Sequence, residues 1–248
     1  MIDTHVHILP GIDNGPATVA DALTMARTLV QEGVRIAAAT PHYNDEFPHR
    51  SASEIFQRVS SLQVELSNAG IPLRLCIGHE VLIKPRLVDD VRLGYIATLH
   101  GSRYLLLELW NSIWLPETER VVFELREHGI IPIIAHPERY RAIQQEPERL
   151  GTLLRLGALA QMTIGSLLGA HGTAARRSAE MLLKKGLIHC LASDAHGFRL
   201  RPPQIAQGLH YARQFLGIER VHFLTEVQPA AILTNELVGT PSLHMKVR

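Results

Sequence analysis

The chain has 248 residues, 46% of them hydrophobic, so it can bury a sizeable core and still form one domain over residues 1–248. Its 25 lysines and arginines nearly balance 24 aspartates and glutamates, so we expect no nucleic-acid partner. No apolar stretch is long enough to span a bilayer, and Asp3, His5 and His7 occupy the place of a signal peptide. We therefore expect a cytoplasmic protein without direct membrane insertion.

The chain opens on an apolar strand that leads into His5-Val6-His7. Residues i and i+2 of an extended segment face the same side, so both imidazoles can approach one metal ion. A lone His-x-His pair is a weak signal, because such pairs also arise by chance on polar strands. Turn-forming residues follow over 10–16, and a helix is predicted from Thr18 to Gly33.

Further apolar, strand-like runs alternate with helical segments along the rest of the chain. The strands are expected at 34–39, 73–77, 104–109, 130–135, 158–163 and 188–192. The helices are expected from Ser53 to about Ala69 and over 87–93, 117–128, 147–156 and 173–185. Residues 42–49 lack a period and predict a loop. The chain from Gln204 on looks helical, with Gln228-Pro229 starting its last helix and a loose tail after Pro241.

A potential metal ligand follows most of these strands. The candidates are His42, Glu80, Glu108, His136, Asp194 and His196. Continuous apolar strands that alternate with helices predict a parallel sheet covered by helices, in which reactive residues cluster beyond the carboxyl ends of the strands. A seven-unit barrel fits better than an open sheet, because ligands from the first and last strands must meet around one centre. Of the neighbours His79 and Glu80, only one is expected to face this centre.

The two cysteines, Cys76 and Cys190, lie in apolar strand-like runs, where a small buried thiol is the usual role. Some phosphatases use a cysteine nucleophile with an arginine six residues later, but positions 82 and 196 hold Leu and His. We therefore expect neither a disulfide framework nor a cysteine-based phosphatase.

Six separated motifs, taken in order, resemble the PHP (polymerase and histidinol phosphatase) metallohydrolases. The closest resemblance is to the manganese-dependent bacterial protein-tyrosine phosphatases encoded with capsular and exopolysaccharide genes. The motifs are Asp3-Thr4-His5-Val6-His7, Thr40-Pro41-His42, Gly78-His79-Glu80, Leu107-Glu108, Ala135-His136-Pro137-Glu138-Arg139, and Ser193-Asp194-Ala195-His196 with Arg201-Pro202. The resemblance implies an α/β fold, a distorted (β/α)7 TIM-like barrel of PHP type, and hydrolysis of phosphotyrosine on a bacterial tyrosine autokinase that controls capsular or exopolysaccharide synthesis.

The resemblance also implies a site for two or three divalent ions. His5, His7 and Asp194 would bind one ion, Glu80 would bridge it to a second held by Glu108 and His136, and His42, His196 and Asn14 would hold the third. Manganese is implied by the resemblance, with iron, zinc, cobalt and magnesium as alternatives for imidazole and carboxylate ligands. The family usually has Asp-Asp-Gly where this chain has Asp13-Asn14-Gly15, so the third ion is expected to bind weakly, to recruit Asp13 or to be lost.

Two ions that share a carboxylate can lower the pKa of a bridging water to near neutrality, so that hydroxide attacks phosphorus without a protein nucleophile. Arg139 and Arg201 are the predicted clamps for the phosphoryl oxygens, because a guanidinium can hold two oxygens at once. Trp114, Tyr43 and Phe47 are candidates for an entrance that accepts an aromatic ring, although packing is the commoner role of such residues.

Two other functions fit the same residues. A PHP-type phosphatase of a small phosphate ester, such as histidinol phosphate, would keep the metal site and change the substrate. A non-catalytic metal-binding scaffold is motivated by Asn14, but both ions needed to generate hydroxide keep their full ligand sets.

Overall fold

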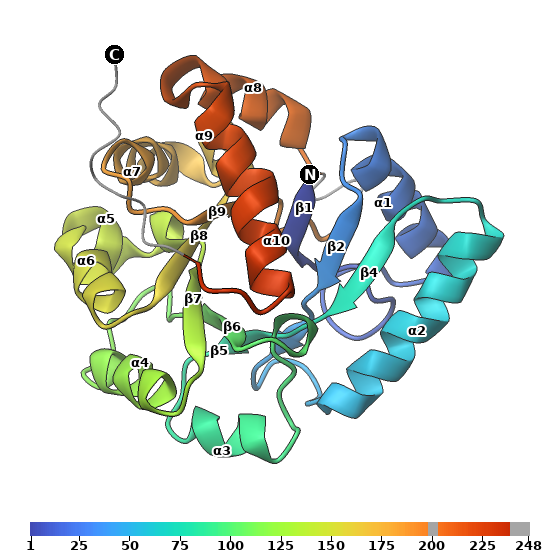
Figure 1. Cartoon of the computed structure of the whole chain (residues 1–248), viewed down its shortest axis with the longest axis horizontal. Coiled ribbons are helices and arrows are strands. Elements are labelled where there is room, and N and C mark those ends of the chain that lie inside the picture. Colours follow the sequence, from blue (N-terminus) through green and yellow to red (C-terminus); the bar gives the residue numbers. More distant parts are fainter. Residues whose placement is uncertain (198–202, 239–248) are drawn as a thin grey trace.

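Parallel strands at seven positions form one barrel in the computed structural model, which describes residues 1–197 and 203–238 (Figure 1). One sheet has the order β1 (Ile2–Val6), β2 (Ile36–Ala39), β4 (Arg74–Ile77). The other has the order β3 (His42–Tyr43), β5 (Glu80–Leu82), β6 (Tyr104–Glu108), β7 (Ile131–Ala135), β8 (Leu159–Thr163), β9 (Cys190–Ala192). The predicted α/β barrel of seven units is confirmed.

Two breaks explain why nine strands fill seven positions. The chain passes from β2 to β3 through Thr40-Pro41, where proline has no N–H to donate to a ladder, and from β4 to β5 through Gly78-His79. The two sheets meet where the Glu80 N–H donates to the Pro41 carbonyl at 3.1 Å. The barrel closes through a parallel bridge between Val6 and Ala195, next to β9.

Helices surround the barrel, and in Figure 1 α1 and α2 lie on the opposite side from α5 and α6. The helices are α1 (Val19–Gln31), α2 (Ala52–Asn68), α3 (Leu87–Arg92), α4 (Thr118–Glu127), α5 (Arg141–Gln145), α6 (Glu148–Arg155), α7 (Gly172–Lys184), α8 (Ile205–Leu216), α9 (Ile218–His222) and α10 (Gln228–Leu233). Short 3₁₀ turns are η1 (Leu99–Gly101), η2 (Pro137–Arg139) and η3 (Ile164–Leu168), and a π turn spans Phe223–Val227. In the part of the chain that the structure describes, no helix is long and apolar enough to cross a membrane.

Local sequence signals explain the helix starts and correct one prediction. Thr18 caps α1 by accepting the Asp21 N–H, as expected. The cap of α2 is Ser51 rather than the predicted Ser53, and its hydroxyl accepts the Glu54 N–H at 3.2 Å. Ser51 has a glutamate three residues later, which is the capping-box spacing that Ser53 lacks.

Two short elements went unpredicted. Residues 42–49 were expected to form only a loop, but His42–Tyr43 pairs with β5 as the strand β3. The five-residue helix α5 carries too few positions for an apolar period to be seen. The tail after Pro241 lies outside the described residues.

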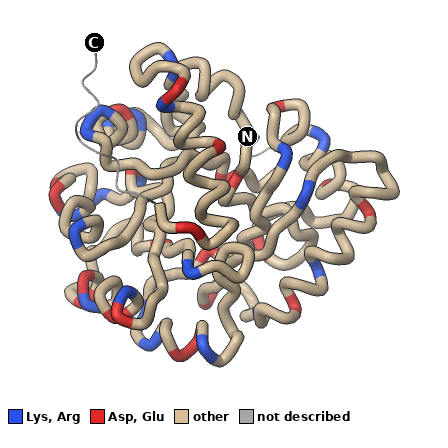
Figure 2. Tube along the Cα trace, viewed as in Figure 1, with Lys and Arg blue, Asp and Glu red and all other residues tan. Residues whose placement is uncertain are grey.

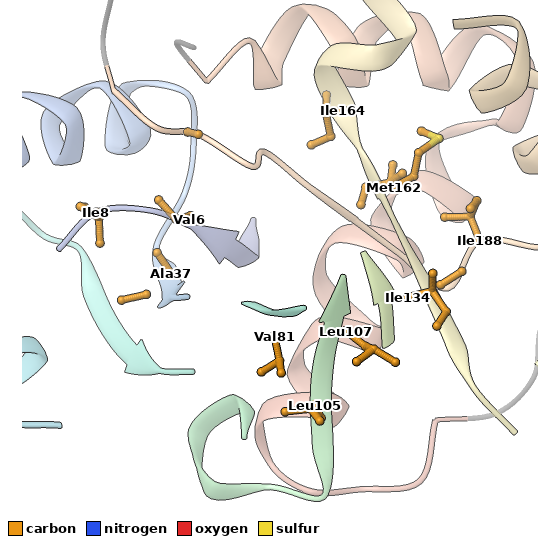
Figure 3. Close-up of a cluster of buried hydrophobic side chains, with 14 of the residues drawn as sticks. Val6, Ile8, Ala37, Val81, Leu105, Leu107, Ile134, Met162, Ile164 and Ile188 are labelled. Carbon is orange, nitrogen blue, oxygen red and sulfur yellow. The ribbon is translucent and has the colours of Figure 1, made fainter. Parts of the chain in front are cut away.

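Strand alternation separates two apolar layers. Tyr104 and Leu106 of β6 face the barrel interior, whereas Leu105 and Leu107 pack with the cluster beneath the helices (Figure 3). Ile232 and Leu233 of α10 join the interior cluster and so cover one end of the barrel with apolar groups. Polar groups are left to the other end, where the strands terminate.

Charged residues of both signs are interspersed along the outer helices (Figure 2). On α2, for example, Arg58 and Glu54 pair at 3.0 Å one turn apart. Such exposed pairs contribute little to stability, so the fold depends on the two apolar layers.

A buried histidine at the start of β9 should make the fold acid-sensitive. The His189 Nδ1 accepts the Ala160 N–H at 3.2 Å, and burial, reinforced by Arg220, lowers the pKa of His189 from 6.5 to about 4. Because the unfolded chain binds this proton more readily, stability present above about pH 6.5 is lost as the pH falls toward 4.

The variant His189→Asn keeps an acceptor oxygen but cannot titrate. We expect the free energy of unfolding to fall between pH 7.5 and pH 5 by roughly 2 kcal/mol less in this variant than in the wild type. Urea unfolding at the two pH values measures this difference. Equal losses in both proteins would contradict a neutral buried His189.

Candidate metal centre

Imidazole and carboxylate groups gather at the carboxyl ends of the strands. His5 lies near the end of β1, Glu108 ends β6, and His136 follows β7. The β2 and β4 breaks place His42 and Glu80 at the same level, at the first residues of β3 and β5. Asp194 and His196 follow β9. The structure thus brings together all the predicted histidine, aspartate and glutamate ligands.

The Glu80 carboxylate lies at the centre of this cluster and is 1% exposed. Its Oε2 is 3.3 Å from His5 Nε2, 3.2 Å from His7 Nε2 and 3.0 Å from His42 Nδ1, and its Oε1 is 2.8 Å from His136 Nε2. The neighbouring His79 faces away, where its Nδ1 accepts the Ala97 N–H at 2.9 Å. Of the two candidates on this segment, Glu80 therefore enters the site.

The donor atoms fit divalent cations better than they fit one another. Among residues 1–197 and 203–238, the buried atoms Glu80 Oε2 and His42 Nδ1 make no hydrogen bond of normal geometry, although they lie 3.0 Å apart. The facing nitrogens His5 Nε2 and His7 Nε2 are 3.1 Å apart. Buried polar atoms without partners are costly, whereas one cation accepts lone pairs from several donors at once.

Among the described residues, three overlapping sets of side chains each bring their donor atoms within 4.8 Å of one another. They are His7, His42 and His196; His5, His7 and Glu80; and His42, Glu80 and Glu108. The sets share members, so ions held by them would lie close together and would share ligands. None of the three sets contains a cysteine, which argues against a structural zinc site.

The pKa values of the carboxyl groups in the cluster also support a site for cations. Burial, together with the neighbouring Glu80, raises the pKa of Glu108 to about 8. Burial also disfavours ionised Asp194, but His5 and Arg139 outweigh it and hold the pKa of Asp194 well below its usual range. Cations between the carboxylates would favour the ionised form of both Glu80 and Glu108.

The backbone at two of the predicted ligands adopts a conformation that non-glycine residues rarely take. His136 has φ of 34° and Asp194 has φ of 52°, both in the left-handed region. Each residue directly follows or closely follows a strand, so this turn aims its side chain across the barrel mouth. Such conformations cost about 1–3 kcal/mol each and cluster at functional sites.

Asp13 stands behind His7. Its Oδ2 lies 2.7 Å from His7 Nδ1 and accepts the His42 backbone N–H at 3.2 Å. A carboxylate on the far nitrogen of an imidazole fixes the tautomer and directs the other nitrogen toward the metal. Asp13 was considered only as a substitute ligand, and this pairing rule is the signal that could have found its position.

Asn14, in contrast, is exposed and lines the cavity above the cluster. Its role as a ligand of the third ion stays a prediction. The next residue, Gly15, must be glycine, because a Cβ there would lie 2.4 Å from the His7 carbonyl oxygen. This loop therefore lies tightly against the first metal-binding motif.

Arg139 lines the same cavity, and its Nη1 donates to Asp194 Oδ2. The adjacent Glu138, for which the sequence favours a surface or supporting role and a catalytic role equally, is fully buried. It accepts the Ser166 hydroxyl at 2.7 Å and the Thr163 N–H at 3.2 Å, and so ties η2 to the end of β8. Arg201 and Pro202 lie outside the described residues.

The cavity over the cluster has a volume of about 400 Å³. Of the described residues, its large apolar lining groups are Leu82, Leu109, Trp110 and Ile113, of which Trp110 and Ile113 are exposed; the predicted Trp114, Tyr43 and Phe47 are not among them.

The three predicted aromatic residues make other contacts. Trp114 contacts the core and donates to Glu119 at 3.1 Å. Tyr43 is buried, and Phe47 stacks on His42. A single apolar residue in a loop without periodicity carries no sequence signal for the direction of its side chain, which is why Trp110 was missed.

Comparison with known proteins gives consistent matches over nearly the whole chain. A family model described as capsular polysaccharide synthesis, CpsB/CapC, matches residues 1–234. The tyrosine-protein phosphatase YwqE of Bacillus subtilis is 34% identical over 248 residues, covering 100% of this chain and 98% of that protein. The tyrosine-protein phosphatase CpsB of Streptococcus agalactiae is 27% identical over 244 residues, covering 96% of this chain and 100% of that protein.

Solved structures agree. A chain from the crystal structures of YwqE from Bacillus subtilis and CpsB from Streptococcus pneumoniae, described as unique metal-dependent tyrosine phosphatases, matches with a TM-score of 0.93. The identity is 32%, and 97% of each chain is covered. A β-aspartyl dipeptidase from Fervidobacterium islandicum matches with a TM-score of 0.57 at 15% identity, covering 98% of this chain and 76% of that one, which shows a shared fold alone.

The contact between Asp13 and His7 predicts an effect on metal affinity. Asp13→Asn keeps the size of the side chain but removes its charge, so we expect manganese affinity to fall roughly 10–100-fold. Calorimetric titration of chelator-treated protein measures this change. Asp21→Asn, the same substitution at a half-buried position on α1 that is not among the described residues of the donor sets, should bind manganese as the wild type does. Unchanged affinity in Asp13→Asn would mean that Asp13 does not support the site.

Proposed function

This chain belongs to the CpsB/CapC family of capsular polysaccharide synthesis, and from that premise we propose that it is a metal-dependent protein-tyrosine phosphatase. The observation that carries the proposal is the buried cluster around Glu80, in which carboxylate and imidazole donors converge beneath an open cavity that also holds Arg139. Both cysteines are buried in the barrel interior, and no cysteine is among the described residues that line the cavity. A cysteine nucleophile therefore has no support.

We assign the ions as follows. By resemblance to the family, His5, His7 and Asp194 would hold the first, Glu80, Glu108 and His136 the second, and His42, His196 and Asn14 the third. Manganese is the proposed metal by resemblance to the family; imidazoles mixed with carboxylates, without cysteine in the described donor sets, fit manganese and also iron or zinc. When bound, such ions supply a hydroxide nucleophile at neutral pH and neutralise charge on the phosphoryl group.

The residues of the chain orient the phosphate for this chemistry. Arg139 uses one N–H on Asp194, and its guanidinium has further donors that can bind phosphoryl oxygens. Arg201 is the second proposed clamp, by resemblance to the family. The leaving phenol has a pKa of about 10, so departure as phenolate needs little help from a proton donor.

A phosphotyrosine-bearing protein is the proposed substrate. The cavity is open at the surface, so it can receive a side chain carried on another polypeptide. The family description and the relatives named tyrosine-protein phosphatase favour a bacterial tyrosine autokinase of capsular or exopolysaccharide synthesis, which would place the protein in the cytoplasm.

The assay that tests this proposal compares two phosphate esters. Protein loaded with manganese is given a phosphotyrosine peptide or histidinol phosphate, and phosphate release is measured. We expect much the higher kcat/KM on the peptide. A preference for histidinol phosphate would favour the small-ester function, and no release from either ester would favour a non-catalytic scaffold.

Removing a ligand of the cluster should abolish turnover. We expect His136→Ala and Asp194→Ala each to lower kcat/KM by roughly 1,000-fold or more, because each removes a direct metal ligand. His128→Ala, at the exposed end of α4, is the control and should keep wild-type activity. Metal content per chain, determined alongside the rates, should fall only in the cluster variants. Full activity in either of them would show that the site is misassigned.

A further inference from the structure

We infer that Trp110 and Ile113, on the loop after β6, form a subsite for the aromatic ring of the substrate, so that the enzyme selects aryl over alkyl phosphate esters. This inference rests on the proposed phosphatase function and adds the residues that determine its specificity. Neither residue takes part in holding the ions.

The loop that carries these two residues is held in place from below. Leu109 is buried, and its N–H donates to the Tyr140 hydroxyl at 2.9 Å. Further along, Trp114 packs against the core and its Nε1 donates to Glu119 Oε1 at 3.1 Å. Trp110 and Ile113 lie between these two anchors, so the loop presents them in a fixed place.

Both side chains are open to solvent at the mouth of the cavity. Trp110 is 44% exposed and Ile113 is 61% exposed. The same cavity contains Glu80, Glu108 and Arg139 at its floor and sides. The exposed indole and branched alkyl group favour binding of an apolar ligand group above the polar cluster, because such a group removes their apolar surface from water.

The lining of the cavity is chemically divided. Apart from Leu82 and Leu109, its remaining lining residues are polar or charged, with Asn14, Asn44 and Glu46 among them. Because Leu109 is buried and Leu82 is half-buried, the exposed apolar surface for an aromatic ring is formed mainly by Trp110 and Ile113 on the β6 loop, while amide groups remain for the polar backbone of a peptide. A phosphotyrosine, which joins its ring to phosphorus through one oxygen, can satisfy both Arg139 and this apolar surface at once.

Other exposed aromatic side chains do not share this position. Phe56 lies on α2 and Phe123 on α4, and neither is among the described residues that line the cavity. Phe123 is 49% exposed, close to the value for Trp110, so it offers a matched control.

The experiment measures binding rather than turnover. Full-length protein loaded with manganese is titrated calorimetrically with phenylphosphonate and with methylphosphonate, which carry the same dianionic head and differ in the ring. For the wild type we expect tighter binding of phenylphosphonate. Trp110→Ala should weaken phenylphosphonate roughly tenfold and change methylphosphonate less than about twofold, as expected for loss of one aromatic contact.

Two further variants complete the test. Trp110→Phe, which retains a ring, should recover most of the affinity for phenylphosphonate, and Phe123→Ala should bind both ligands as the wild type does. In turnover, Trp110→Ala should raise KM for a phosphotyrosine peptide and leave kcat nearly unchanged, because the ring contact is made before and during reaction alike.

The outcomes separate the two proposals. If Trp110→Ala weakens both phosphonates equally, or neither, the aryl subsite is wrong while the phosphatase function stands. If neither phosphonate binds to the loaded wild-type protein, the phosphate site itself is wrong and the subsite falls with it.

Discussion

One buried carboxylate, that of Glu80, is the contact on which the site depends. Its two oxygens lie within 3.3 Å of nitrogens from His5, His7, His42 and His136, which come from three different strand positions of the barrel. The strand break at Gly78 makes this possible, because a Cβ at Gly78 would lie 2.8 Å from a Leu99 methyl and 3.1 Å from a Thr40 methyl. A charge this deeply buried is tolerated only with close partners, so fold and site constrain each other.

Apolar and polar side chains occupy different levels along the barrel axis. Apolar side chains such as Leu106 and Ile133 fill the interior, and α10 covers that end with Ile232 and Leu233. Two residues after Leu106 on β6, Glu108 faces the cavity over the cluster. The same period of two that packs the core therefore delivers the ligand, and its pKa is raised because the apolar layer below withholds solvent.

Much of this arrangement could be predicted from the sequence, because it depends on rules that act along the chain. Apolar runs ending in His, Asp or Glu indicated both the parallel barrel and the mouth at which those residues meet. What could not be predicted depends on contacts between distant segments or on side-chain direction. Glu138 meets Ser166 only through the packing of β7 beside β8, and Trp110 differs from Trp114 only in which side of one loop it occupies.

Anomalous X-ray diffraction from crystals of the protein grown with manganese tests the central claim most directly. The account predicts two or three manganese peaks within the cluster, with at least one bridged by the carboxylate of Glu80. Peaks confined to other parts of the molecule, or a Glu80 carboxylate that contacts no ion, would contradict it.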